Sequence, residues 1–166
     1  MRNKKVLFLT QAAVIAAIYV VLTIFISAFN LASGAIQVRI SEALTILPFF
    51  TPAAIPGLFA GCLLSKILTG CCLIDIVFGS LATLVAAFVS YGLRKHKWLV
   101  AIPPIVANAL VVPFVLIYGY GVNSPVGYLI ATVGAGEVLS CGVIGMILLL
   151  SLDKVKGSIF GARVKQ

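Results

Sequence analysis

The sequence predicts an all-α integral membrane protein with six transmembrane helices and both chain ends in the cytoplasm. The chain has 166 residues, of which 62% are hydrophobic and 10% are charged; soluble domains have about 25% charged residues. The apolar residues form long continuous runs rather than alternating patterns, which favours helices over a closed barrel in lipid. The basic residues gather beside apolar runs, as in the cytoplasmic loops of membrane proteins: Arg2, Lys4, Lys5; Arg94, Lys95, Lys97; and Lys154, Lys156, Arg163, Lys165.

Six apolar segments are predicted as spans of one membrane domain, residues 1–166. The first follows the N-terminal basic cluster and is too long for the apolar core of a signal peptide, so we expect it to stay in the protein. Ser41 is the expected N-cap of the second helix, and Pro48 and Pro52 are expected to form the turn that follows it. The spans lie at about 6–29, 36–50, 53–68, 73–93, 98–120 and 126–152.

The second segment is short for a membrane span. As an α-helix, 36–50 covers only about 22 Å of a hydrocarbon core that is about 30 Å thick. The basic clusters nevertheless favour counting 36–50 and 53–68 separately. The N-terminus and the 94–97 loop can both be cytoplasmic only if the chain between them crosses the membrane an even number of times.

Small residues recur at every fourth position of the third segment, at Ala53, Gly57, Gly61 and Ser65. This spacing is typical of seams where membrane helices pack closely. The first segment carries two overlapping pairs of the same spacing, Ala12/Ala16 and Ala13/Ala17. These are either ordinary helix alanines or helix contacts.

Five charged residues lie away from the basic flanks: Arg39, Glu42, Lys66, Asp75 and Glu137. A charge at the centre of a bilayer costs about 2.5–3.5 kcal/mol, so such residues usually have a partner or face a cavity. Arg39 and Glu42 lie three residues apart, and Lys66 and Asp75 flank a turn, where we favour a structural ion pair.

Glu137 has no cation nearby in sequence, and Asn108 is expected at a similar depth in the neighbouring helix. The two side chains either bond each other and hold two helices together, or they point into a ligand cavity. Aromatic candidates for lining such a cavity include Phe50, Tyr118 and Tyr120. The tyrosines equally suit the membrane interface.

The sequence lacks the residues that several classes of protein function require. The chain has no G-x-x-x-x-G-K-[ST] phosphate loop, and its single histidine, His96, lies in a basic loop. The four cysteines do not have zinc-ligand or disulfide-framework spacing. We therefore predict no catalytic residues, no metal site, no cofactor and no nucleic-acid partner.

Four stretches resemble the QueT family: GAIQVRISEALTILPFFTPAAIPGLFAGCLLSKIL, LIDIVFGSLATLVAA, RKHKWL and the GAGE segment at Glu137. Members of this family are substrate-binding subunits (S-components) of energy-coupling factor (ECF) transporters in prokaryotic cell membranes. The resemblance covers essentially residues 4–150.

The resemblance implies six membrane helices in the S-component fold and no enzyme activity of the chain itself. It implies a transmembrane coupling protein (EcfT) and two ATPases as partners, with docking through Ala12, Ala13, Ala16 and Ala17. The implied ligand is a queuosine precursor, which is a deazaguanine base, or queuine. A carboxylate suits the donor edge of such a base, so Glu137 is the first candidate contact. The other candidates are Asn108, Glu42, Arg39, Gln37, Asp75, Phe50 and Tyr118.

Three alternatives stay open at this point. The chain could be an S-component for a different vitamin, or a secondary transporter of a small cationic solute that uses Glu137 and Asp75 without ATPase partners. It could also be a structural membrane protein whose internal polar residues only join helices.

Overall fold

The computed structural model describes residues 4–28 and 39–159, and all regular structure in these ranges is helical. Its α-helices are α1 (Lys4–Ala28), α2 (Ala54–Leu68), α3 (Ser80–Gly92), α4 (Ile102–Tyr120), α5 (Val126–Glu137) and α6 (Gly145–Ile159). Shorter helices of other types are η1 (Ile40–Phe49) and η3 (Lys97–Leu99), both 3-10, and η2 (Asp75–Gly79) and η4 (Val138–Ile144), both π.

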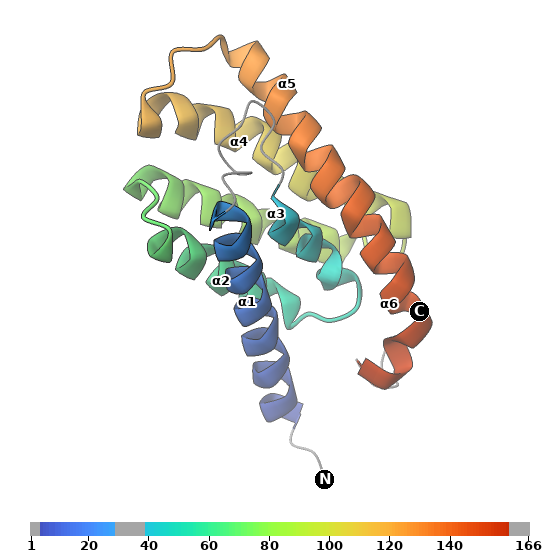
Figure 1. Ribbon diagram of the computed structural model, residues 1–166. Helices are drawn as coiled ribbons and strands as arrows, with labels where there is room; N and C mark the ends of the chain where they lie inside the picture. Colours follow the sequence, from blue (N-terminus) through green and yellow to red (C-terminus); the bar gives the residue numbers. More distant parts are fainter. Residues whose placement is uncertain (1–3, 29–38, 160–166) are drawn as a thin grey trace.

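Within residues 4–28 and 39–159, four continuous helical segments are long and apolar enough to cross a membrane: Lys4–Ala28, Asp75–Gly92, Lys97–Tyr120 and Val126–Val155. The last combines α5, η4 and α6, the long orange-to-red rod in Figure 1. These agree with the four long predicted spans. Ile40–Phe49 and Ala54–Leu68 are shorter apolar helices, so six full transmembrane helices and cytoplasmic termini remain a prediction.

The second segment differs from the prediction in type and start. It is a 3-10 helix that begins at Ile40, so Arg39 occupies the N-cap position, without a side-chain capping bond, and Ser41 is not the cap. Pro48 lies inside it and cannot donate a backbone hydrogen bond. Every residue from Ser41 to Phe50 is buried. Tertiary burial, rather than helix propensity, therefore stabilises this segment, the teal helix at the centre of Figure 1.

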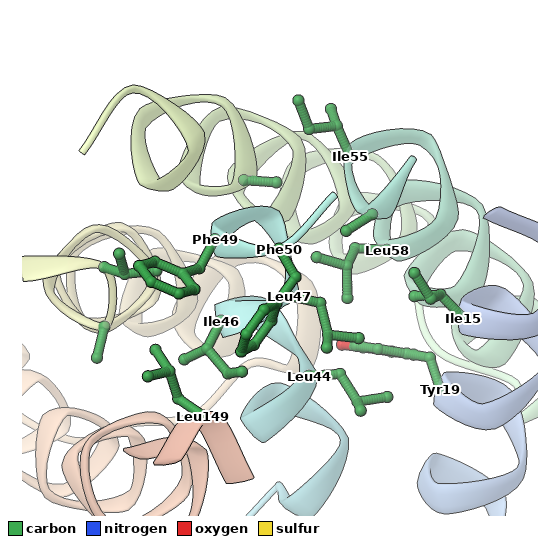
Figure 2. Close-up of a cluster of buried hydrophobic side chains, with 14 of the residues drawn as sticks. Ile15, Tyr19, Leu44, Ile46, Leu47, Phe49, Phe50, Ile55, Leu58 and Leu149 are labelled. Atoms are coloured by element: carbon green, nitrogen blue, oxygen red, sulfur yellow. The ribbon is translucent and has the colours of Figure 1, made fainter. Parts of the chain in front are cut away.

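The core forms around η1. Its apolar side chains pack against Ile15 and Tyr19 of α1, Leu58 of α2 and Leu149 of α6, as Figure 2 shows. Phe50 belongs to this core, with its ring centroid 4.9 Å from that of Phe49 in an edge-to-face arrangement. η1 is thus the central element against which the longer helices pack.

The predicted seam of small residues is the contact between α1 and α2. A Cβ added at Gly57 would lie 2.7 Å from the Ala12 carbonyl oxygen, and one added at Gly61 would lie 3.1 Å from Ala16 Cα. Glycine therefore allows the two backbones to approach each other closely. Ala12 and Ala16 are buried in this contact, whereas Ala13 and Ala17 are exposed on the outer surface of α1.

Candidate functional site

The five internal charged residues interact with one another electrostatically. They come from five segments: the residue before η1 (Arg39), η1 (Glu42), α2 (Lys66), η2 (Asp75) and α5 (Glu137). The internal charges are thus three carboxyl groups and two cations. Residues 29–38 contain no Asp, Glu, Lys or Arg that would change these numbers. The other described ion pair, Lys97–Asp153 at 2.6 Å, joins η3 to α6, near the end of the bundle where α6 terminates (Figure 1).

Lys66 and Asp75 form a buried ion pair, as the sequence predicts. Lys66 Nζ donates to Asp75 Oδ1, and the Tyr120 hydroxyl donates to Asp75 Oδ2 at 3.0 Å. Gly79 makes room for the pair, because a Cβ there would lie 2.6 Å from Lys66 Nζ and 2.8 Å from Asp75 Oδ1. The pair is therefore held against the helix backbone, with Asp75 at the start of the π-helical turn.

Glu42 and Glu137 form a second buried cluster with Cys141, in which one carboxylate oxygen of each glutamate and the cysteine sulfur all lie within 4.8 Å of one another. The two glutamates are only 2% and 3% exposed. The Tyr19 hydroxyl donates to Glu42 Oε1 at 2.5 Å. Cys141 Sγ lies 3.3 Å from Glu137 Oε2, and the Asn108 side chain interacts with the Glu137 carboxyl group.

Arg39 connects the two clusters electrostatically. Its guanidinium interacts with the carboxyl groups of Asp75, Glu137 and Glu42, and its backbone N–H donates to Ser140 Oγ at 3.1 Å. The Glu42–Glu137–Cys141 spacing would by itself suit a metal ion. The nearby guanidinium opposes a cation there, and we assign no metal to it.

A cavity of about 480 Å³ is lined by Arg39, Lys66 and Asp75. Its lining does not include Glu42, Asn108, Glu137 or Cys141. Pockets of about 300–1,000 Å³ are typical of small-molecule sites. Its polar lining comes from Tyr19, Thr23, Ser27, Arg39, Ser41, Ser65, Lys66, Thr69, Cys71, Asp75 and Tyr120. Tyr19 lines the cavity, and its hydroxyl donates to the Glu42 carboxyl group. Tyr19 therefore connects Glu42 to the cavity wall.

The structure brings together five of the predicted site residues: Arg39, Glu42, Asp75, Asn108 and Glu137. Three others are not part of the group. Phe50 is buried in the core. Tyr118 is 75% exposed and lies in a separate apolar cleft with Phe78 and Phe114. Gln37 lies outside the described residues.

Sequence reasoning missed Tyr19 and Cys141. Tyr19 follows Ala12 and Ala16 on the same helix face, so a lone tyrosine on a small-residue stripe was the signal for a side chain that enters the core. Cys141 lies four residues after Glu137, a spacing that brings two helical side chains together.

This is an all-helical membrane protein in which Arg39, Lys66 and Asp75 line a cavity of small-molecule size. A family model described as "QueT transporter" matches residues 9–154. Since this match covers most of the chain, the chain belongs to the QueT transporter family, which confirms the family predicted from the sequence.

A curated relative, the queuosine precursor transporter QueT of Lactococcus lactis subsp. cremoris, is 35% identical over 92 residues. The alignment covers 55% of this chain and 53% of the relative, so the chain matches about half the length of that protein. No solved structure matches the chain.

Proposed function

We propose that this chain is the S-component of an ECF transporter and captures a queuosine precursor, a deazaguanine base, or queuine. Family membership and the name of the Lactococcus relative support the substrate class. The observation that carries the proposal is the cavity of about 480 Å³, which is lined by Asp75 and by Tyr19, the residue that donates to buried Glu42. Carboxylates are strong acceptors for the adjacent N–H groups of a guanine-like edge.

The remaining residues fit roles around the same ring. Glu137 accepts from the ring N–H and the exocyclic amine. Asn108, which interacts with Glu137, supports that carboxylate or pairs with the neighbouring polar atom of the base. A cationic aminomethyl substituent suits Asp75 or Glu42. Tyr120 replaces Tyr118 as the aromatic candidate, because it lines the cavity.

Direct binding tests this function. The purified chain in detergent is titrated by calorimetry with queuine, the aminomethyl- and cyano-deazaguanines, guanine and unrelated vitamins. We expect tight binding of one deazaguanine and no binding of guanine. Binding of an unrelated vitamin instead would assign a different substrate to the same scaffold. Silence across the panel from folded protein would contradict a ligand-capture function.

A secondary transporter of a small cationic solute is the second candidate, because the internal carboxyl groups outnumber the cations three to two. The two functions differ in energy source. We propose that the partners are the coupling protein EcfT and two ATPases, and that both chain ends are cytoplasmic, so uptake in liposomes needs those partners and ATP. Uptake by the chain alone that ends when the ion gradient collapses would favour the second candidate.

Docking to the coupling protein is proposed for Ala13 and Ala17 rather than for both alanine pairs, since Ala12 and Ala16 are buried against α2. We expect Ala13→Leu/Ala17→Leu to keep ligand affinity and lose partner assembly. Overpacking a close contact costs about 1–3 kcal/mol, or about 5- to 150-fold in assembly. The measurement is co-purification with the partners, together with ATP-driven uptake.

Ala131→Leu is the matched control, because Ala131 is an exposed alanine on α5. Assembly of the Ala13/Ala17 variant at the level of this control would remove these alanines from the docking surface.

A further inference from the structure

Glu42 carries a buried acceptor atom without a partner. Its Oε2 has no hydrogen-bond partner among the described residues, although the side chain is only 2% exposed. More than about 90% of buried polar groups are bonded, and an ionised carboxylate oxygen is a particularly strong acceptor. The atom can therefore accept a hydrogen bond from a donor that the described residues do not supply.

The surroundings fix which part of each glutamate is available. Tyr19 holds Glu42 at Oε1, which leaves Oε2 open. Glu137 is held at Oε2 by Cys141 and interacts with Asn108. An ionised carboxylate has about four acceptor positions in all, so Glu137 can accept further hydrogen bonds. Two carboxyl groups within 4.8 Å of each other can therefore bond neighbouring donors on one flat ligand edge.

Arg39 completes the pattern with donors. Its guanidinium interacts with both glutamates, and arginine presents five N–H donors. A guanine-like edge has a carbonyl oxygen, then a ring N–H, then an exocyclic amino group with two hydrogens. The carbonyl oxygen, an acceptor, matches the Arg39 guanidinium. The three N–H donors match the carboxylate oxygens of Glu137 and Glu42.

We infer that Glu42 and Glu137 bind opposite hydrogens of one exocyclic amino group, so that Glu42 makes the site specific for 2-amino bases. Glu137 takes the ring N–H and the nearer amine hydrogen, and Glu42 Oε2 takes the other hydrogen. The inference rests on the proposed function for the identity of the ring. A base that lacks the 2-amino group would leave Glu42 Oε2 buried without a partner, which is costly.

The test combines a change in the ligand with a change in the protein. Wild type and Glu42→Gln are titrated with the tightest-binding deazaguanine and with the same molecule lacking its 2-amino group. In wild type, loss of the amino group removes one hydrogen bond to each glutamate. It should weaken binding by about 100-fold or more, since one hydrogen bond to a charged group accounts for about 10- to 100-fold. Glu42→Gln should bind the 2-amino base more weakly, and its discrimination should be about 10- to 100-fold smaller, because only the hydrogen bond to Glu137 remains.

The outcomes separate this inference from the proposed function. If both proteins discriminate by the same factor, Glu42 does not read the amino group and the inference is wrong, while the function stands. If folded wild type binds neither base, the proposed function fails, and the inference fails with it.

Two further variants control for folding and for charge. Glu42→Asp keeps the charge but shortens the side chain, and it should also lose discrimination, which provides a second test if glutamine reduces the yield of folded protein. Asp153→Asn removes a carboxylate from the ion pair with Lys97, outside the cavity. This variant should discriminate as wild type does.

Discussion

Replacing Glu137 with glutamine is expected to weaken binding of the deazaguanine base by about 100-fold or more. Hydrogen bonds to a charged group contribute about 1.5–3 kcal/mol each, and Glu137 is proposed to accept two of them. Glutamine has nearly the same shape but turns an amide N–H₂ group toward ligand donors. Calorimetric titration of the purified variant measures the loss, with Asp153→Asn as the control for removing a carboxylate elsewhere.

The Glu137→Gln variant is expected to stay folded. After the substitution, Arg39 still interacts with Asp75 and Glu42, and the internal charges become two carboxyl groups and two cations. No cation is therefore left buried without a counterion, which is the situation that makes loss of one buried partner costly. A wild-type affinity in a folded Glu137→Gln protein would remove Glu137 from the site.

Replacing Gly61 with leucine is expected to destabilise the protein by at least about 3 kcal/mol, the upper part of the range for overpacked cores. A Cβ at this position would lie 2.8 Å from Tyr19 Cβ and 3.1 Å from both Cα and the carbonyl oxygen of Ala16. Two of these atoms belong to the α1 backbone, which cannot move aside as a flexible side chain would. The yield of monodisperse protein and its melting temperature in detergent measure the effect.

Gly127→Leu is the matched control for the substitution at Gly61. A Cβ added at Gly127 meets nothing within 4 Å, and leucine has a higher helix propensity than glycine. This variant should melt at or slightly above the wild-type temperature. If the Gly61 and Gly127 variants melted together, the close contact between α1 and α2 would be disproved.

The sequence predicted the long helices and the α1–α2 seam because both depend on local patterns, namely apolar run length and the spacing of small residues. It could not decide which alanine pair faces α2. Ala12/Ala16 and Ala13/Ala17 have the same spacing, and only the position of the neighbouring helix distinguishes them. It also missed the 3-10 form of η1, since burial on all sides determines that conformation.

The candidate site was predicted in part for the same reason. A charged residue inside a bilayer costs free energy, so its presence in an apolar segment indicates a partner or a function. Arg39, Glu42, Asp75 and Glu137 could therefore be selected from the sequence alone. Aromatic residues carry no such signal. Tyr118 and Tyr120 are two residues apart on α4, which places them on different helix faces, and only the packing of α4 shows that Tyr120 lines the cavity.

The hydrogen bond between Tyr19 and Glu42 means that α1 contacts the candidate site with one face and presents exposed alanines on the opposite face. One face holds a carboxyl group of the candidate site, and the other carries the exposed alanines proposed for docking. If a ligand changes the strength of this bond, it also changes the free energy of the α1 orientation that the proposed coupling protein would recognise. Thermodynamic linkage then requires reciprocity: partner binding alters ligand affinity by the same factor by which the ligand alters partner binding. If the ligand-free form bound the proposed coupling protein more tightly than the ligand-bound form, binding of that protein would lower ligand affinity by the same factor and favour release of the ligand.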